Sequence, residues 1–466
     1  MGQKYSVVFD ISKNKPFGND ISSYKDIKGN SVSLLRKDHP SSRAGTKFPG
    51  FKIYMHMLPE VGATYSYYLE SVYYDNSLQE GLDKATVGMT KYVEVYFWEA
   101  DYDNICPLFL ELGDIYLHRK ALNISSGIRS NKWTNVQPVS YESLRVLFEN
   151  AVVISLQKTE GKKYTPHPSK DDFKVDKEPS ETKFHTMTVN RDKDKPCQGY
   201  VAFTQKLDNG KPMNVLSTWN SYKKNMIRFK ESIVQNEYKS AKIYYGSGDT
   251  QHNHPLILEL ELVKDEKGAL EFYAINKDGR WEINSEIQTD NLDEKLDEQN
   301  CKYNNLFAVD LSKTAENLSK DNGSYSCGPD CKKHRITVSE YSTGNSDGYR
   351  NIQHVPDREY GDVLGRIKNG KSSLTLEGQE FPIERVSQVL VYYPLCSPKE
   401  PVLLRIYHGN AEGEWFKRDS ISNNKWKRAT EEDLKKGHTE KSAIKKVLDN
   451  LVKELNIPEC EIKKDL

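Results

Sequence analysis

The sequence predicts an α+β protein of three tandem strand-rich domains, each a mainly antiparallel sheet with a C-terminal helix. Two observations support this prediction. The same landmarks recur in the same order in each third of the 466-residue chain. The segments between them are rich in β-branched and aromatic residues, which favour strands. Copies of about 150 residues can each bury a core, so they are expected to be domains and not solenoid repeats. We call 1–150, 151–302 and 303–466 the first, second and third repeat units.

Five landmarks define the repeat. Each copy opens with an apolar run that ends in lysine, over 7–13, 152–158 and 307–313. A glycine–aromatic pair, an aromatic doublet, a proline before an apolar run and a tryptophan then follow. They are Gly50–Phe51, Gly199–Tyr200 and Gly348–Tyr349; Tyr96–Phe97, Tyr244–Tyr245 and Tyr392–Tyr393; Pro107, Pro255 and Pro401; and Trp133, Trp281 and Trp426. Such regular spacing indicates one structural unit present in three copies.

The elements of one unit are predicted in chain order. The opening strand and a polar stretch lead to an alternating segment, which is typical of a half-buried strand. The doublet strand and the proline-led strand are expected to pair as a hairpin at the centre of the sheet, since proline suits a strand start. An aromatic strand leads to the tryptophan, which we expect to close the core. Helical spacing of apolar residues then predicts helices over 141–150, 291–301 and 443–456, the last of them strongly amphipathic.

Composition limits the classes of partner. The chain has 67 basic and 67 acidic residues, so no bulk attraction to nucleic acid is expected. No apolar run of about 18 residues occurs, which predicts no transmembrane helix. The first strand follows Met1 almost at once, so we expect no secretory signal and either an intracellular protein or a clipped longer chain. Seven unevenly spread cysteines favour reduced thiols in a cytosol-like compartment over a shared disulfide framework.

One cluster has metal-like spacing, and it comprises Cys327, Cys331 and His334. Zinc takes four ligands from two such groups, and the other two copies lack the cluster. Free or locally paired thiols are therefore the favoured interpretation, a Cys327–Cys331 bridge is an alternative, and no cofactor is expected. Gly2 and Ser6 fit the myristoylation pattern, which makes Gly2 a candidate lipidation site.

Two histidines occupy matching places in the repeat. His56 and His354 each lie six residues after the glycine of the glycine–aromatic pair, where the second unit has Gln205. All three side chains can form hydrogen bonds. A hydrogen-bonded structural polar group is therefore favoured at these positions over a general base.

The loops before the three landmark prolines are the predicted binding rim, because loops on a rigid sheet carry recognition. Their composition differs among the copies, as expected of exposed segments. The candidate binding residues are Tyr102 and Asp103, His252 and His254, and Lys399 and Glu400.

The layout resembles the FAINT repeats (frequently associated in Theileria) of piroplasm parasites. The residues behind the resemblance are the aromatic-rich strands, the run from Pro255 to Leu258, and the pairs before the tryptophans, Asn131–Lys132 and Asn424–Lys425. It touches all three units. The resemblance implies proteins that are secreted or directed to the host cell and have no known enzymatic activity or catalytic residues.

We therefore expect a non-enzymatic, multi-domain interaction protein that engages host or parasite protein partners and gains avidity from its linked units. Three alternatives remain. A carbohydrate or small-ligand binding module would use outward-facing doublet aromatics. An enzyme would have a pocket in one unit only, and the third unit with its Cys/His cluster is the candidate. A cytoplasmic protein would act as an intracellular scaffold.

Overall fold

The structure is a computed structural model. It describes residues 3–14, 22–37, 51–59, 65–74, 76–98, 104, 107–113, 115–119, 131–135, 150–164, 186–192, 198–223, 225–234, 236–263, 269–318, 323–327, 331, 335–340, 348–357, 363–409, 413–435, 441–457 and 460. The chain divides into two compact bodies. The N-terminal body comprises Met1–Asn190, Thr204–Lys242 and Glu259–Ile283. The C-terminal body comprises Arg191–Phe203, Ile243–Leu258 and Asn284–Leu466, and so contains the third repeat unit with part of the second.

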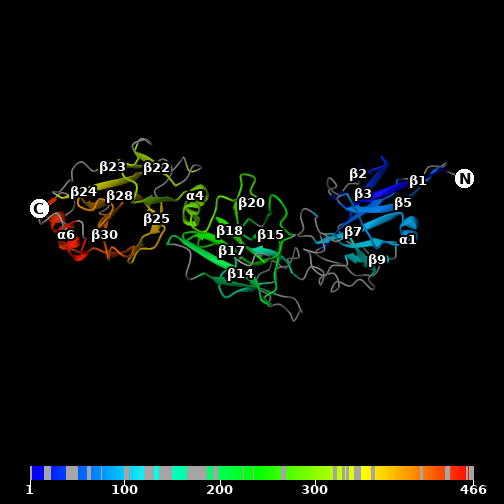
Figure 1. The fold of residues 1–466 in the computed structure, drawn as a ribbon, viewed down its shortest axis with the longest axis horizontal. Coiled ribbons are helices and arrows are strands. Elements are labelled where there is room, and N and C mark those ends of the chain that lie inside the picture. Colours follow the sequence, from blue (N-terminus) through cyan, green and yellow to red (C-terminus); the bar gives the residue numbers. More distant parts are fainter. Residues whose placement is uncertain are drawn as a thin grey trace. The chain divides into compact units, whose positions relative to one another are not determined.

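Large, mainly antiparallel sheets dominate the described part of the chain (Figure 1). The first has the order β10 (Trp133–Asn135), β9 (Ile115–Arg119), β8 (Pro107–Leu112), β7 (Tyr92–Trp98), β4 (Phe51–Met57), β3 (Ser31–Lys37) and β2 (Ser22–Lys25). The second has the order β12 (Lys163–Tyr164), β13 (Met187–Arg191), β14 (Tyr200–Leu207), β17 (Tyr238–Gly246), β18 (Ile257–Leu262), β19 (Leu270–Ile275) and β20 (Trp281–Ile283). The third has the order β22 (Ser324–Ser326), β23 (Arg335–Glu340), β24 (Tyr349–Pro356), β28 (Val386–Pro394), β29 (Leu403–His408), β30 (Glu414–Arg418), β31 (Lys425–Arg428) and β27 (Thr375–Leu376). The strand-rich, mainly antiparallel class predicted from the sequence is therefore confirmed.

The opening strand of each unit does not join the large sheet, which corrects the prediction of a single sheet per unit. It pairs in parallel with a later strand in a separate three-stranded sheet. These small sheets are β1 (Gln3–Asp10), β5 (Tyr65–Tyr74) and β6 (Ser77–Leu78); β11 (Ala151–Ser155), β15 (Asn214–Asn220) and β16 (Asn225–Ile227); and β21 (Phe307–Asp310), β25 (Leu364–Asn369) and β26 (Ser372–Ser373). A continuous apolar run is typical of a parallel strand covered on both faces.

The core of the third unit lies between its small and large sheets. Val309 of β21 and Ile367 of β25 belong to one buried cluster with Ile352, Val391 and Phe416 of the large sheet. An equivalent cluster in the first unit contains residues of both of its sheets. Each of these two units is therefore a two-layer sandwich around an apolar interior.

Helices add a further layer to this arrangement. The described helices are α1 (Lys84–Met89), α4 (Leu292–Asn304), α5 (Glu432–Lys435) and α6 (Lys441–Glu454). In the third unit, Leu448 and Leu451 of α6 pack against Tyr392, Leu403 and Trp415 on the second face of the large sheet. Helices α4 and α6 occur where the sequence predicts them. The predicted helix over 141–150 lies outside the described residues except for Asn150, so a helix in every unit stays a prediction.

Two smaller predictions are confirmed. The doublet strand and the proline-led strand are neighbours in every large sheet, and the three landmark tryptophans are buried in the cores. The doublet aromatics are buried as well. They lie in the protein interior because large aromatic side chains contribute most when removed from water.

Candidate functional site

The candidate site is the contact between the second and third repeat units, which lies inside the C-terminal body. Helix α4 ends the second unit, and only Asn305 and Leu306 separate it from β21. Asn305 adopts a left-handed conformation, with φ of 55°, which ends the helix sharply. The short connection holds α4 against the small sheet of the third unit. We call this contact the inter-repeat joint, formed by α4, β25 and the segment around Ser247.

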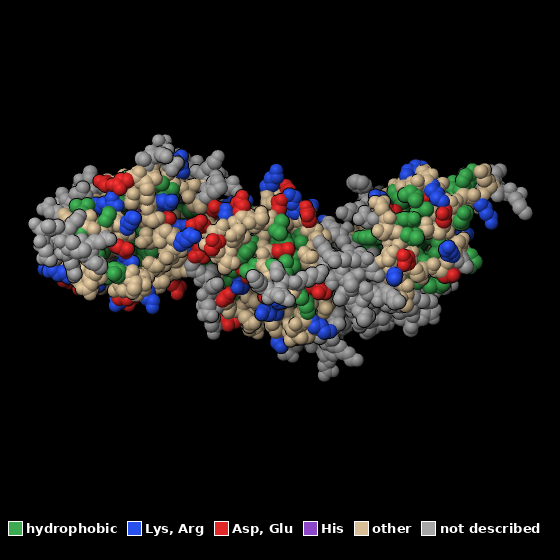
Figure 2. Space-filling model, viewed as in Figure 1, with side chains coloured by type: hydrophobic (Ala, Val, Ile, Leu, Met, Phe, Trp, Pro, Cys, Tyr) green, Lys and Arg blue, Asp and Glu red, His purple; other side chains and the backbone are tan. Residues whose placement is uncertain are grey.

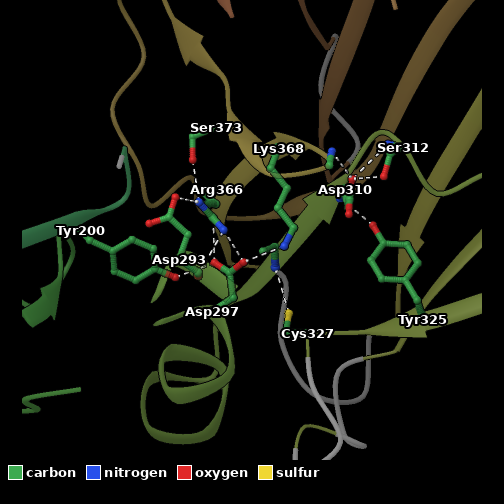
Figure 3. A network of polar contacts seen from close by, with 12 residues as sticks. Tyr200, Asp293, Asp297, Asp310, Ser312, Tyr325, Cys327, Arg366, Lys368 and Ser373 are labelled. Atoms are coloured by element: carbon green, nitrogen blue, oxygen red, sulfur yellow. Dashed lines mark hydrogen bonds and ion pairs between the residues drawn. The ribbon is translucent and has the colours of Figure 1, made fainter. Parts of the chain in front are cut away.

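A buried ion pair lies at the centre of the joint. Arg366 of β25 donates from Nε to Oδ1 of Asp297 at 2.7 Å and from Nη2 to Oδ2 at 2.6 Å. The two side chains are only 1% and 2% exposed. Figure 3 shows the planar guanidinium facing the carboxylate. A two-point geometry of this kind fixes both the distance and the relative orientation of the helix and the strand.

Further hydrogen bonds and an ion pair surround both charged groups (Figure 3). Arg366 also donates from Nη1 to the Ser373 hydroxyl at 2.6 Å and from Nη2 to the carbonyl of Asp293 at 3.2 Å. Lys368 Nζ lies 3.3 Å from Oδ2 of Asp297. The hydroxyl of Tyr200 donates to Oδ1 of Asp297 at 2.7 Å. Charged groups that are removed from water need several hydrogen-bond or ion-pair partners, because a buried charge without partners destabilises the fold.

The backbones of the two units approach closely beside the ion pair. A Cβ added to Gly199, where φ is 96°, would lie 2.6 Å from the carbonyl oxygen of Gly365. The Ser247 hydroxyl donates to the carbonyl of Phe381 at 2.6 Å, and a Cβ on Gly248 would meet Pro382. The glycine of the second glycine–aromatic pair is thus required by packing of one unit on the next.

A disulfide crosses the same joint. Cys301 of α4 is bonded to Cys331 of the third unit, 30 residues later. A second disulfide joins Cys396 to Cys460. The expectation of reduced thiols is therefore wrong for these four cysteines. The pairing escapes sequence reasoning because Cys301 lies far from the Cys327–Cys331 segment along the chain and approaches it only through the fold.

Cys327 has a structural role. Its Sγ accepts the backbone N–H of Ala308 at 3.2 Å, and at the matching place in the first unit Asp26 accepts the N–H of Val8 at 2.9 Å. Burial raises the pKa of the Cys327 thiol to about 12. Both residues cover an exposed edge of the opening strand, which would otherwise present unpaired backbone groups.

The matching histidines and glutamine tie the two sheets together. The Tyr24 hydroxyl accepts the N–H of Asp10 at 3.0 Å and lies 3.0 Å from Nδ1 of His56. The same chain of contacts runs from Asp310 through Tyr325 to His354. In the second unit, Tyr164 accepts the N–H of Ser155 and contacts Gln205 Oε1 at 2.5 Å. Complete burial lowers the pKa of both His56 and His354 to about 3. The expected structural role is supported, because each buried imidazole shares a hydrogen bond with the tyrosine that binds the opening strand.

The predicted rim residues of the second unit are largely held by their neighbours. The His252 ring lies 4.8 Å, centre to centre, from those of Phe203 and Tyr245. Burial lowers its pKa, with Arg191 contributing in the same direction. The N–H of His254 donates to Oδ2 of Asp249 at 2.7 Å. This loop therefore folds back on its own sheet, and its first residues form part of the joint.

The rim of the third unit is more open. Lys399 is exposed, and Leu395 exposes 55% of its surface. Glu400 pairs with Arg418, whose Nη2 also donates to the carbonyl of Ile421 at 2.9 Å. Arg418 thereby connects the 395–400 loop to the loop that carries Ile421, which is 41% exposed. We call Leu395, Lys399 and Ile421 the third-unit loop patch.

Several predicted residues lie outside the described residues, namely Gly2, Tyr102, Asp103 and His334. Cys331 is bridged to Cys301 and so is not available as a thiolate ligand. Within the described ranges no group of three or more Cys, His, Asp or Glu side chains could hold a metal ion. No helix among them is long and apolar enough to cross a membrane.

Sequence reasoning missed Arg366 and Asp297. Each sits in a segment that otherwise has ordinary polarity, and neither has a charged counterpart in all copies. Arg366 lies two residues after buried Leu364 and directly before buried Ile367, so the available signal was an arginine within a run of core positions. Charged residues are almost never fully buried unless paired.

Comparison of the chain with models of protein families found no match, and searches among curated proteins and solved structures found none either.

Proposed function

We propose that the chain is a multi-domain protein-binding protein, in which the C-terminal body, made of the third repeat unit and part of the second, acts as one preformed unit. The observation that carries the proposal is the buried Arg366–Asp297 pair, which fixes one unit on the next. Linked modules gain affinity when their geometry matches the partner, and a fixed geometry lowers the entropy lost on binding.

The roles of the chemically reactive side chains favour binding over catalysis. Cys301 and Cys331 are bridged, Cys327 covers a strand edge, and His56 and His354 are buried as neutral groups. These residues are among the chemically reactive groups that the sequence singled out, and all of them lie in the described part of the chain. Each has a structural explanation instead.

The third-unit loop patch is the proposed contact surface. Leu395 and Ile421 offer apolar area and Lys399 a charge, on loops that Arg418 and the Cys396–Cys460 bridge hold in place. Apolar anchors surrounded by polar groups are typical of protein-binding surfaces. The carbohydrate alternative is less well supported, because the doublet aromatics it would use are buried.

The two disulfides support an oxidising compartment, since such bonds persist in secreted proteins and are rare in the cytosol. Together with the resemblance to the FAINT repeats, they favour a secreted or host-directed parasite protein over an intracellular scaffold. Its partner would then be a host protein.

Proximity labelling in the host cell tests the proposal. The full chain should label a defined set of host proteins, and Leu395→Ser combined with Lys399→Ala should lose at least part of that set. Ile283→Ser, at an exposed apolar residue of the second unit, is the matched control and should leave the set unchanged. Labelling of parasite cytosolic proteins alone would overturn the host-directed reading and favour the scaffold. Identical labelling by the loop variant would exclude the patch.

A further inference from the structure

In the third unit, the face of the small sheet that points away from the core binds a helix. Arg366 and Lys368 of β25 and Ser373 of β26 point away from the core and toward α4. The acidic residues Asp293 and Asp297 of α4 match them in charge. In this unit, therefore, a helix from the preceding unit covers the small sheet (Figure 3).

The first unit has the same face at known positions. The pairing of Val7 with Leu69 and Val8 with Ser71, around a bulge, repeats that of Phe307 with Leu364 and Ala308 with Arg366. Ser71 therefore stands where the third unit has Arg366. The next positions follow, because Tyr73 pairs with Leu78 as Lys368 pairs with Ser373.

Chemically, the first-unit face differs from its counterpart. Serine, tyrosine and leucine replace arginine, lysine and serine, so the ligands for an acidic helix are gone. Leu69 and Val72 belong to the core, whereas Leu78 is 46% exposed and Tyr68 is 39% exposed. Figure 2 shows hydrophobic side chains on the first unit, over the elements that Figure 1 labels β1, β5 and α1. We call Tyr68, Ser71, Tyr73 and Leu78 the first-unit sheet face.

The second unit carries a similar set. Ser217, Trp219 and Met226 occupy the places of Ser71, Tyr73 and Leu78, as the pairing of Val153 with Ser217 and of Trp219 with Met226 shows. A small residue, an aromatic residue and an aliphatic residue thus recur in the first two units. The segment before the second unit is the predicted helix over 141–150, whose spaced residues Leu144, Leu147 and Phe148 are apolar.

We propose that the first-unit sheet face binds an amphipathic helix of a partner protein, with an aliphatic and aromatic side of that helix against the sheet. The helix would lie as α4 lies on β25, with Ser71 permitting close approach and Tyr68 and Leu78 as anchors. Lys28 and Glu70, which pair with one another beside the face, would form its polar rim. This inference deepens the proposed protein-binding function by naming a second surface and the form of its partner.

A binding measurement with the purified full chain tests this inference. The probe is a fluorescently labelled peptide of residues 139–150, which carries the apolar spacing expected of the ligand. We expect its fluorescence anisotropy to rise with added chain. Tyr73→Lys with Leu78→Ser, which installs the third-unit residues, should weaken binding at least tenfold. Ile283→Ser should bind as the unmodified chain does.

A second peptide tests whether the first-unit sheet face prefers an apolar helix to an acidic one. Residues 290–304 carry Asp293 and Asp297 and should bind the unmodified chain at least tenfold more weakly than the apolar peptide. Equal binding of the apolar peptide by the double variant, or no binding by the unmodified chain, would overturn the inference. Circular dichroism of each variant checks that the fold is kept. Because this test is independent of the third-unit loop patch, its failure would leave the labelling result intact.

Discussion

Arg366 and Asp297 form a two-point ion pair between residues 69 positions apart, with donor–acceptor distances of 2.7 and 2.6 Å and almost no exposure to solvent. This pair joins a strand of the third repeat unit to the last helix of the second.

Removing one partner of the ion pair should destabilise the C-terminal body strongly. Arg366→Ala removes both short hydrogen bonds of the guanidinium to the buried Asp297 carboxylate and leaves Lys368, at 3.3 Å, as its cationic partner; removing one side of a buried ion pair typically costs about 3–5 kcal/mol. Urea unfolding measures the loss. The double variant Arg366→Met with Asp297→Leu should be less destabilised than either single change, because the two most deeply buried charges are removed together. Arg428→Met removes an exposed ion pair with Glu414 and should have little effect. A single variant as stable as the wild type would contradict the prediction.

Acid should destabilise the chain through its two buried histidines. The pKa of His56 and of His354 is about 3 in the folded chain, against an ordinary value of 6.5. Below pH 6.5 the unfolded chain therefore binds protons that the folded chain does not. Stability present above pH 6.5 is lost as the pH falls toward 3. The loss should reach about 2 kcal/mol per histidine by pH 5, at about 1.4 kcal/mol per pH unit.

Glutamine provides the matched variant for this acid effect, since Gln205 fills the same position in the second unit. Thermal unfolding of His56→Gln with His354→Gln, measured from pH 5 to pH 8, should show a flatter pH dependence than the wild type. Ile283→Ser, at an exposed residue that does not titrate, should keep the wild-type slope. An unchanged slope in the double variant would assign the acid sensitivity to other groups.

The Cys301–Cys331 bond should stabilise the inter-repeat joint. It closes a loop of 30 residues, for which the chain-entropy model gives about 3–4 kcal/mol. Cys301→Ser with Cys331→Ser should lower the free energy of unfolding by about this amount, as measured by urea denaturation. Peptide mapping of the unreduced chain is the control and should recover Cys301 linked to Cys331. Recovery of a Cys327–Cys331 pair would contradict the structure and favour the local bridge considered from the sequence.

Cys327 should resist alkylation in the folded chain. Cys327 is partly buried against the core of the third unit, desolvation raises the pKa of its thiol to about 12, and the thiolate is the reactive form. Iodoacetamide at pH 8 should leave the Cys327 peptide unmodified without denaturant and modify it fully in urea, as read by mass spectrometry. Rapid modification of the native chain would show that the thiol is accessible.

The local elements were well predicted because they depend on neighbouring residues. Alternation and β-branched runs identify the strands, and helical spacing identifies α4 and α6. The landmark tryptophans are core residues as their size suggests. The opening strands were placed in the wrong sheet, since an apolar run shows that a strand is covered on both faces without showing which strand it pairs with.

The candidate site was less predictable. Tyr200 was identified as a landmark, but its hydroxyl partner, Asp297, lies 97 residues away. His252 looked like an exposed rim residue because its loop is polar, and contacts with Phe203 and Tyr245 hold it. Pairings of this kind depend on how two sheets and a helix pack, and no local pattern encodes that packing.

By itself, the sequence determined that this chain is strand-rich, that its landmark tryptophans lie in the cores, and where α4 and α6 lie, because the burial of apolar side chains follows the short periods of strand and helix. The tertiary structure alone decided that the opening strands form a second, parallel-paired sheet, that Cys301 meets Cys331, and that Arg366 meets Asp297. Those contacts join segments that are distant in the sequence. They stabilise the protein only after packing has excluded water from between the segments.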